Sequence, residues 1–266
     1  MKTIYTFLAL FPLTAVTCFA QNNSKASPAR TGQGAGIYEV VRNWPKYPEG
    51  KKLGNLHGDI AADSKGKVYI ATGGTIQVIA ADGTYEGELR AKNGNKAFRG
   101  VHGMKVRKID GEETLIIAMP GVKRVVNVRF DGTVVWQIIG PPKVEGMYGS
   151  ISQYNPTDLD VAPDGRVYIV DGYGKSLVHV YDKDRNYLKT FGGKGKEDGQ
   201  FNICHNILID TRSDKPSLLI SDRQNNRLQL HDMEGKFIRT IDDLSLIHIS
   251  EPTRRTPISY AVFCLK

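Results

Sequence analysis

The sequence TDLDVAPDGRVYIVDGYGKSLVHVY, residues 157–181, decides the fold. Polar and apolar residues alternate in residues 157–162, which is the period of a half-buried β-strand. Residues 167–170 and 177–181 are rich in the β-branched and aromatic side chains that favour strands, and Pro163-Asp164-Gly165 has the composition of a tight turn. The stretch predicts three short antiparallel strands joined by turns.

The same pattern occurs four times along the chain. Its closing turns, at Asp82, Asp131, Asp184 and Glu234, are 49, 53 and 50 residues apart. A repeat of this length holds one four-stranded sheet, which is the unit of a β-propeller blade. Three strands of each blade are expected at residues 58–63, 68–71 and 76–79; 102–106, 115–118 and 125–128; 157–162, 167–170 and 177–181; and 205–210, 218–222 and 227–230.

A β-sandwich is the alternative for strands with period two. A sandwich has no reason to repeat one phrase at a nearly constant spacing, so the repeat favours the propeller. We therefore predict an all-β fold, a propeller with about four blades in residues 37–243.

The first residues predict a secretory signal peptide in residues 1–20, because Lys2 precedes a short apolar run that ends at Cys18-Phe19-Ala20. Residues 21–36 are small and polar, as in a flexible leader. A retained membrane anchor would need a longer apolar run, and Pro12 interrupts this one; a lipoprotein anchor on Cys18 is a second alternative. The signal predicts an exported protein, periplasmic or secreted, with no membrane span after cleavage and with Cys204 as its one cysteine.

The last residues, 244–266, are unlike the repeats. Their first part, LSLIHISEPTR, resembles the conceptual translation of a transposon-based sequencing adapter. We expect this tail to be artefactual, and no functional argument rests on His248 or Cys264.

Composition excludes several classes of function. The formal net charge of +8 comes from Lys and Arg scattered among acids, so a nucleic-acid groove is not expected. No G-x-S-x-G elbow is present, and Gly192-Gly193-Lys194-Gly195 lies in a loop between blades with no helix after it. A serine hydrolase and a nucleotide enzyme are therefore not expected.

The repeat also aligns candidate ligands. His102 and His205 fall at one equivalent position in the second and fourth copies, where the first has Gly58 and the third has Thr157. In a propeller the inner strands line the central channel, so these two histidines are expected to face one space, where imidazole nitrogens could share a metal ion. The alternative is that each ring packs or hydrogen-bonds near the axis. His179 and His231 are expected on the surface.

Two phrases resemble NHL repeats. They are NPTDLDV at residues 155–161 and LISDRQNNRLQ at residues 219–229. Propellers of this family generally close with six blades, so the resemblance implies that about two further blades would be needed. A fragment with four blades would leave sheet edges unpaired and would be poorly soluble.

From Phe98 to Phe237, the order of motifs resembles the lyase domain that cleaves peptidyl-α-hydroxyglycine to a peptide amide and glyoxylate. In that family a His-Gly-Leu phrase supplies a zinc ligand, and here Val101-His102-Gly103-Met104 stands in its place. A Gly-Gln-Phe phrase followed by His supplies a second ligand, matched by Gly199-Gln200-Phe201 and His205. The resemblance implies zinc on His102 and His205.

The same resemblance implies two catalytic residues. The phrases at residues 156–159 and 171–173 match a Pro-Thr-Asp-Val and Asp-Gly-Tyr pair, which implies Tyr173 as the base. The phrase at residues 221–229 implies Arg223 as the group that binds a carboxylate or stabilises developing charge. A structural calcium ion in the family is held partly by backbone carbonyls at the positions of His57 and Met104.

This chain departs from the family pattern in three places. The family's third zinc histidine and a calcium-binding aspartate come from a last blade with no counterpart here, and Ala71-Thr72-Gly73-Gly74 stands where the first blade carries an arginine. Two functions therefore stay open: a metal-dependent amidating lyase, and a non-catalytic propeller whose channel binds a peptide, a glycan, another small extracellular ligand or a protein.

Overall fold

The chain falls into two compact units, Met1–Trp44 and Pro45–Lys266. The computed structural model describes residues 30–31, 38–39, 41, 43–72, 74–92 and 96–242. The predicted signal peptide, most of the leader and the tail after residue 243 lie outside these ranges. In the first unit, β1 (Arg30–Thr31) pairs with β2 (Tyr38–Glu39) in antiparallel fashion. None of the helices in the described ranges is long and apolar enough to cross a membrane.

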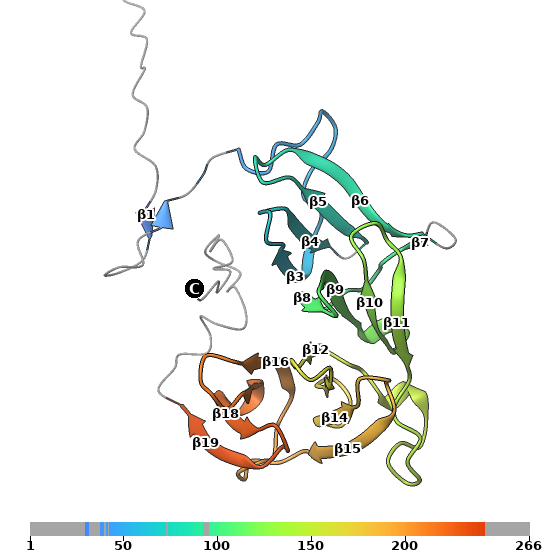
Figure 1. Cartoon of the computed structure of the whole chain (residues 1–266), viewed down its shortest axis with the longest axis vertical. Coiled ribbons are helices and arrows are strands. Elements are labelled where there is room, and N and C mark those ends of the chain that lie inside the picture. The colour runs from blue at the N-terminus through green and yellow to red at the C-terminus, as the bar shows by residue number, and fades with distance from the viewer. Residues whose placement is uncertain are drawn as a thin grey trace, which may run out of the picture. The chain divides into compact units, whose positions relative to one another are not determined.

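The second unit contains four antiparallel sheets, each made of strands consecutive in the chain (Figure 1). We call them blades one to four. Blade one consists of β3 (Leu56–Ala62), β4 (Val68–Thr72), β5 (Ile76–Ile79), β6 (Tyr85–Ala91) and the short β7 (Lys96–Ala97). Blade two consists of β8 (Gly103–Ile109), β9 (Glu112–Met119), β10 (Arg124–Val128) and β11 (Val134–Ile139). Blade three consists of β12 (Asp158–Val161), β13 (Val167–Asp171), β14 (Leu177–Tyr181) and β15 (Tyr187–Gly192). Blade four consists of β16 (Cys204–Asp210), β17 (Ser217–Asp222), β18 (Arg227–Asp232) and β19 (Phe237–Ile241).

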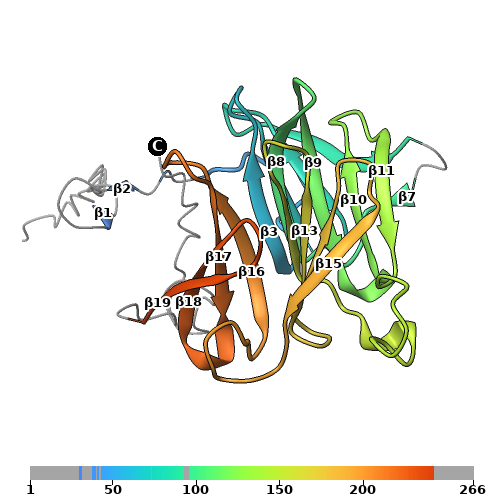
Figure 2. The same ribbon diagram turned by 60° about the horizontal axis from the view of Figure 1, so that its bottom comes forward.

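The first strand of each blade packs against the first strand of the next. Strands β3, β8, β12 and β16 are neighbours in that order (Figures 1 and 2). Three 3₁₀ turns, η1 (Pro120–Val122), η2 (Ile151–Gln153) and η3 (Arg223–Asn225), are the helical elements in the described ranges. The predicted all-β propeller with about four blades is therefore confirmed.

The second strands of blades two and three are apolar on both faces because each of these blades has a neighbouring blade on both sides. In β9, Leu115, Ile117 and Met119 belong to the core between blades one and two, whereas Ile116 and Ala118 belong to the core between blades two and three. Side chains alternate between the faces of a strand, so each neighbouring blade receives every second residue. This explains why the repeats read there as continuous apolar runs rather than as alternating ones.

The closing turn of each blade needs a residue with left-handed backbone. Gly83, Gly132 and Gly235 take φ values of 90°, 86° and 81° in blades one, two and four. Glycine adopts this conformation without the steric cost that a Cβ atom brings. Blade three places Arg185 there with a φ of 68°, which is why its turn lacks the Asp-Gly signal of the other blades.

Buried carboxylates on β12 join three blades. Asp158 forms an ion pair with Lys105 of blade two and accepts a hydrogen bond from the backbone N–H of Ile207 in blade four, at 3.0 Å. Asp160 repeats the arrangement two residues later. It pairs with both Arg107 nitrogens Nε and Nη2, at 2.6 and 2.8 Å, and accepts the N–H of Ile209 at 2.9 Å. Both aspartates have no exposed surface, so these partners replace the water that their charges lose.

Replacing Asp160 by Asn should lower the free energy of unfolding by about 3 kcal/mol, because it leaves the half-buried Arg107 guanidinium without its counter-charge. The measurement is urea unfolding of both proteins. Asp164→Asn is the control, since Asp164 pairs with Arg166 at the surface, and it should cost less than about 1 kcal/mol. Equal losses in the two variants would contradict the structural role of Asp160.

Gly103→Ala should lower the free energy of unfolding by about 1–3 kcal/mol, the usual cost of overpacking. A Cβ atom on Gly103 would lie 2.4 Å from Asp158 Oδ1 and 2.7 Å from the Thr157 carbonyl oxygen. Gly121→Ala is the matched control, because a Cβ atom there meets nothing within 4 Å. Thermal denaturation of the two variants compares them, and a loss in Gly121→Ala as large as that in Gly103→Ala would argue against close approach as the cause.

Candidate functional site

Three polar rings from three blades meet at one point. His102 directly precedes β8, His205 lies in β16, and Tyr173 lies in the turn after β13. The Tyr173 hydroxyl is 3.0 Å from Nε2 of His102 and 3.0 Å from Nε2 of His205. The centroids of the two imidazole rings are 4.7 Å apart. The structure thus brings together three of the four side chains that the sequence predicted for the site.

The other ring nitrogen of each histidine is held by an acceptor. His102 Nδ1 lies 2.8 Å from the Thr157 carbonyl oxygen, and His205 Nδ1 lies 2.8 Å from Asn206 Oδ1. Both oxygens can only accept, so both Nδ1 atoms carry a hydrogen, and in its neutral form each ring presents the lone pair of Nε2. Such a partner behind the ring orients histidine ligands in metal sites.

These two orienting groups were missed by the sequence analysis. Thr157 was placed at the position equivalent to the histidines, but its contribution is a backbone carbonyl, which has no signature in the sequence. Asn206 directly follows His205 and could have been proposed from that adjacency.

Tyr173 has one hydroxyl hydrogen, which it can donate to only one of the two Nε2 atoms at a time. Two ring nitrogens and one hydroxyl oxygen therefore face the same point.

The turn that carries Tyr173 is fixed by its neighbours Asp171 and Gly172. A Cβ atom on Gly172 would lie 2.3 Å from the Cys204 carbonyl oxygen and 2.5 Å from Thr157 Oγ1, so blade four approaches too closely for any other residue. Asp171 is fully buried and its carboxylate accepts the backbone N–H groups of Asn155 and Lys175, at 2.6 and 2.8 Å. The Asp-Gly-Tyr phrase therefore has a structural reason for its first two residues.

Arg223 occupies the corresponding turn of blade four. It begins η3, directly after the buried Asp222, and its backbone N–H donates to the Ile203 carbonyl at 3.0 Å. Its side chain is half-buried. Among the contacts between described residues, none joins the Arg223 guanidinium to the rings of His102, Tyr173 and His205. The structure thus places Arg223 on a turn equivalent to that of Tyr173, and its role toward a substrate stays a prediction.

Met104 lies deeper between blades one and two. Its side chain is 1% exposed and packs in the core, so a backbone carbonyl is the one ligand that Met104 could offer a cation. Its backbone N–H lies 3.4 Å from Asp59 Oδ2, and burial raises the pKa of Asp59, opposed by the nearby Lys105 ammonium. The side chain of His57 is outside the described residues.

The two histidines are suitable ligands for zinc, but they are fewer than a catalytic zinc site needs. Two neutral imidazoles with oriented Nε2 atoms are common zinc ligands, but a catalytic site has three protein ligands. The described part of the chain contains no group of three His, Cys, Asp or Glu side chains placed to hold a metal ion.

His179 and His231, expected on the surface, are both fully buried, so that prediction was wrong. They lie on β14 and β18, the third strands of blades three and four. Tyr148 and Tyr154 of the loop before β12 contact the His179 ring, and Phe191 and Phe201 contact the His231 ring. His179 is paired at both nitrogens, with Thr190 Oγ1 at 2.7 Å and the Tyr148 hydroxyl at 2.8 Å. Burial lowers the pKa of His179 to about 4, so the ring is neutral near pH 7.

Known proteins resemble this chain over most of its length. NHL repeat-containing protein 3 of Mus musculus is 30% identical over 238 residues, which cover 83% of this chain and 64% of that protein. The protein of the same name from Homo sapiens is 29% identical over 210 residues, covering 74% of this chain and 57% of that protein. This chain therefore spans less than two thirds of the length of these relatives. No protein-family model matches the sequence.

Solved structures resemble it in fold. A protein of unknown function from Bacteroides caccae has a TM-score of 0.50 at 11% identity, covering 79% of this chain and 65% of that one. A streptogramin B lyase has a TM-score of 0.50 at 12% identity, covering 71% and 55%. At these identities the likeness concerns the fold alone. With the two relatives, it confirms the expected resemblance to NHL-repeat β-propellers.

The buried His179 should make the protein sensitive to acid. Its pKa is about 4 in the folded chain and 6.5 for the unperturbed group, so unfolding takes up a proton between these values. The stability that a neutral His179 contributes is complete above pH 6.5 and is lost as the pH falls toward 4, by about 3 kcal/mol in total.

His179→Gln tests this, because Gln229 occupies the equivalent position in blade four. Unfolding free energies of wild type and variant should run parallel above pH 6.5 and converge or cross as the pH falls toward 4. Curves that stay parallel down to pH 4 would show that His179 is not held neutral.

Proposed function

We propose that this NHL-repeat β-propeller is an exported, zinc-dependent lyase that acts on peptides ending in α-hydroxyglycine. The observation that supports it is the pair of imidazoles whose Nδ1 atoms are held by Thr157 and Asn206, and whose Nε2 atoms face the Tyr173 hydroxyl. Export rests on the sequence of residues 1–20 alone.

In this proposal His102 and His205 would bind zinc through Nε2, and Met104 would offer its carbonyl to a structural calcium ion. A bound divalent ion polarises a hydroxyl group that it contacts and stabilises the negative charge that develops on it. A third zinc ligand would have to come from outside the described residues.

The reaction needs a base and a group that holds a carboxylate. Tyr173, 39% exposed and beside both imidazoles, would first lose its own hydroxyl proton to solvent and then, as the phenolate, accept the proton of the substrate's α-hydroxyl. The bond between Cα and the amide nitrogen then breaks, the carbon becomes the aldehyde of glyoxylate, and the nitrogen takes up a proton to give the peptide amide. Arg223 would hold the substrate carboxylate by paired hydrogen bonds.

A second candidate is a non-catalytic propeller that binds a peptide or another extracellular ligand in its channel. The blade-one turn favours it. The stretch Ala71-Thr72-Gly73-Gly74 stands where the lyases carry an arginine, and the Thr72 hydroxyl donates to the Thr75 carbonyl at 3.0 Å. One substrate-binding group of the lyases therefore has no equivalent in that turn.

Metal content separates the two candidates. The complete natural gene product should contain close to one zinc ion per chain by mass spectrometry, and His102→Ala with His205→Ala should remove it, because two nitrogen ligands are lost. Tyr173→Phe should keep the zinc and lower the release of glyoxylate from hydroxyglycine peptides by about 10²–10⁴-fold, the usual contribution of a catalytic base. Wild-type protein without zinc and without activity would leave the binding propeller as the better account.

A further inference from the structure

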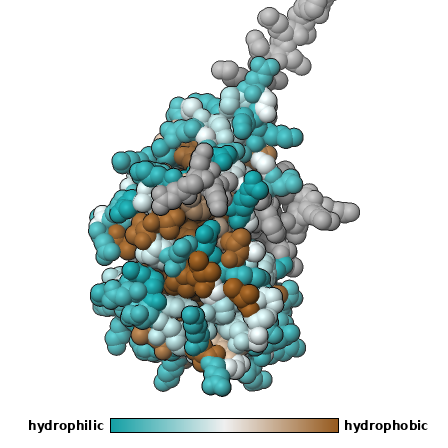
Figure 3. All heavy atoms as spheres, turned by 90° about the vertical axis from the view of Figure 1, so that its right-hand side faces the viewer, coloured by the Kyte–Doolittle hydropathy of each residue, from teal (hydrophilic) through white to brown (hydrophobic). Residues whose placement is uncertain are grey.

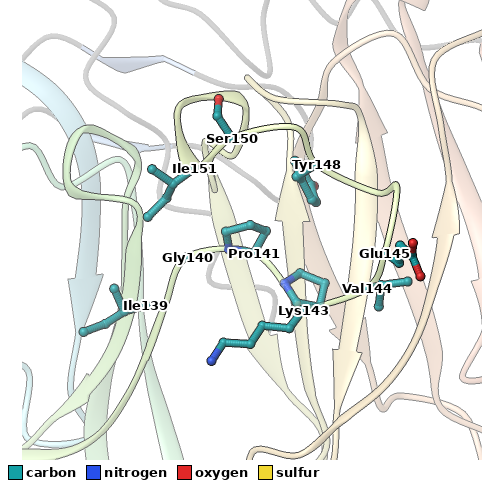
Figure 4. A pocket seen from close by; sticks show the side chains of 10 residues that line it. Ile139, Gly140, Pro141, Lys143, Val144, Glu145, Tyr148, Ser150 and Ile151 are labelled. Atoms are coloured by element: carbon teal, nitrogen blue, oxygen red, sulfur yellow. The ribbon is translucent and has the colours of Figure 1, made fainter.

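The connection between blades two and three is a long loop, residues 140–157, that contains η2. Apolar side chains gather on the face of the molecule that carries β11 and this loop (Figure 3), and those exposed there include Val135, Ile139, Val144 and Ile151. A cavity of about 470 Å³ lies between the end of β11 and the loop. Figure 4 shows Tyr148 at the blade-three side of this cavity, opposite Ile139.

Tyr148 connects the loop to the turn beneath the candidate site. Its hydroxyl donates to Asp171 Oδ2 at 2.6 Å and lies 2.8 Å from His179 Nε2. Burial and the adjacent Asp171 carboxylate raise the pKa of Tyr148 above its usual value, so the hydroxyl keeps its proton. Because that proton goes to Asp171, His179 must donate from Nε2, and its Nδ1 then accepts from Thr190.

Asp171 in turn fixes the backbone that carries Tyr173. Besides accepting from Tyr148, its carboxylate accepts the N–H of Asn155, and the Asn155 carbonyl accepts the N–H of Tyr173 at 3.3 Å. The Asp171 carbonyl accepts the N–H groups of Gly174 and Ser176, at 3.2 and 3.0 Å. Both ends of the Tyr173 turn therefore depend on the position of Asp171.

Blade four holds the equivalent aspartate differently. Asp222 accepts the N–H of Asn202 at 2.6 Å, as Asp171 does from Asn155, but its charge is met by Arg227, whose Nε lies 2.8 Å from Oδ2. Asp171 is paired across the sheet with Leu177 in blade three, whereas Asp222 is paired with Arg227 in blade four. The loop hydroxyl of Tyr148 thus provides in blade three a contact that an arginine provides in blade four.

We propose that Tyr148 is a positioning residue, which holds the Tyr173 hydroxyl between His102 and His205 by way of Asp171. The proposal deepens the proposed function, since it concerns the same tyrosine, but the arrangement of the rings can be tested without turnover. Loss of the Tyr148 hydroxyl leaves a buried carboxylate short of a donor, which favours a shift of the turn.

The test places 3-fluorotyrosine at position 173 and records its ¹⁹F resonance in wild type, Tyr148→Phe and Tyr154→Phe. Tyr154 is the matched control, because it lies in the same loop and its buried hydroxyl has no hydrogen-bond partner among the residues that the structure describes. Tyr148→Phe should shift the resonance or add a second one, whereas Tyr154→Phe should leave it unchanged. A wild-type spectrum in Tyr148→Phe would overturn the proposal.

A rescue variant separates positioning from general loss of stability. Leu177→Arg in the Tyr148→Phe background gives Asp171 the cation that Asp222 has, and it should restore the wild-type resonance. Failure of the rescue, in a double variant that melts like wild type, would count against the role of Asp171.

If lyase activity is found, Tyr148→Phe should lower kcat roughly ten- to a hundredfold with KM nearly unchanged, the loss expected of a misplaced reacting group. A shifted resonance in a protein without lyase activity would leave the positioning role standing and refute the proposed function alone.

Discussion

The contact between successive inner strands is the constraint on which the rest of the molecule depends. Asp158 and Asp160 each take a cation from blade two and a backbone N–H from blade four, so one strand fixes the spacing of its two neighbours. Burying both carboxylates costs free energy, and this cost is offset only in a geometry that gives every carboxylate oxygen a partner. The positions of His102 and His205, on the two strands joined in this way, follow from that geometry.

A second pair of buried aspartates supports the turns above the strands. Asp171 and Asp222 occupy equivalent places, and each orders a turn that presents a candidate functional residue, Tyr173 or Arg223. The side chains that donate to them differ: a neutral loop tyrosine donates to Asp171 in blade three, and a strand arginine pairs with Asp222 in blade four. Blades three and four thus share the position of this carboxylate and differ in the side chain that binds it.

The candidate site is defined by two imidazole rings that are oriented toward one point. Each ring is oriented from behind by an oxygen that accepts from Nδ1, which leaves Nε2 to face Tyr173. This is the arrangement that a metal ion needs of its histidines, and it also suits a hydrogen-bonded channel wall. The number of ligands, more than their kind, separates a lyase from a binding propeller.

The sequence by itself determined the strands, the closing turns and the equivalence of His102 with His205, because alternation and turn chemistry depend on residues adjacent in the chain. It was wrong about His179 and His231, since burial of these side chains depends on groups distant in the chain, such as Tyr148 over His179 and Phe191 over His231. It gave no sign of the Thr157 carbonyl or of Tyr148, because a backbone acceptor has no side chain to recognise and a loop between blades has no period. Only the tertiary structure decided which groups meet, because packing of one blade on the next sets the distance between residues far apart in the chain. His102 and Thr157 are 55 positions apart, His102 and Tyr173 are 71 apart, and Tyr173 and His205 are 32 apart.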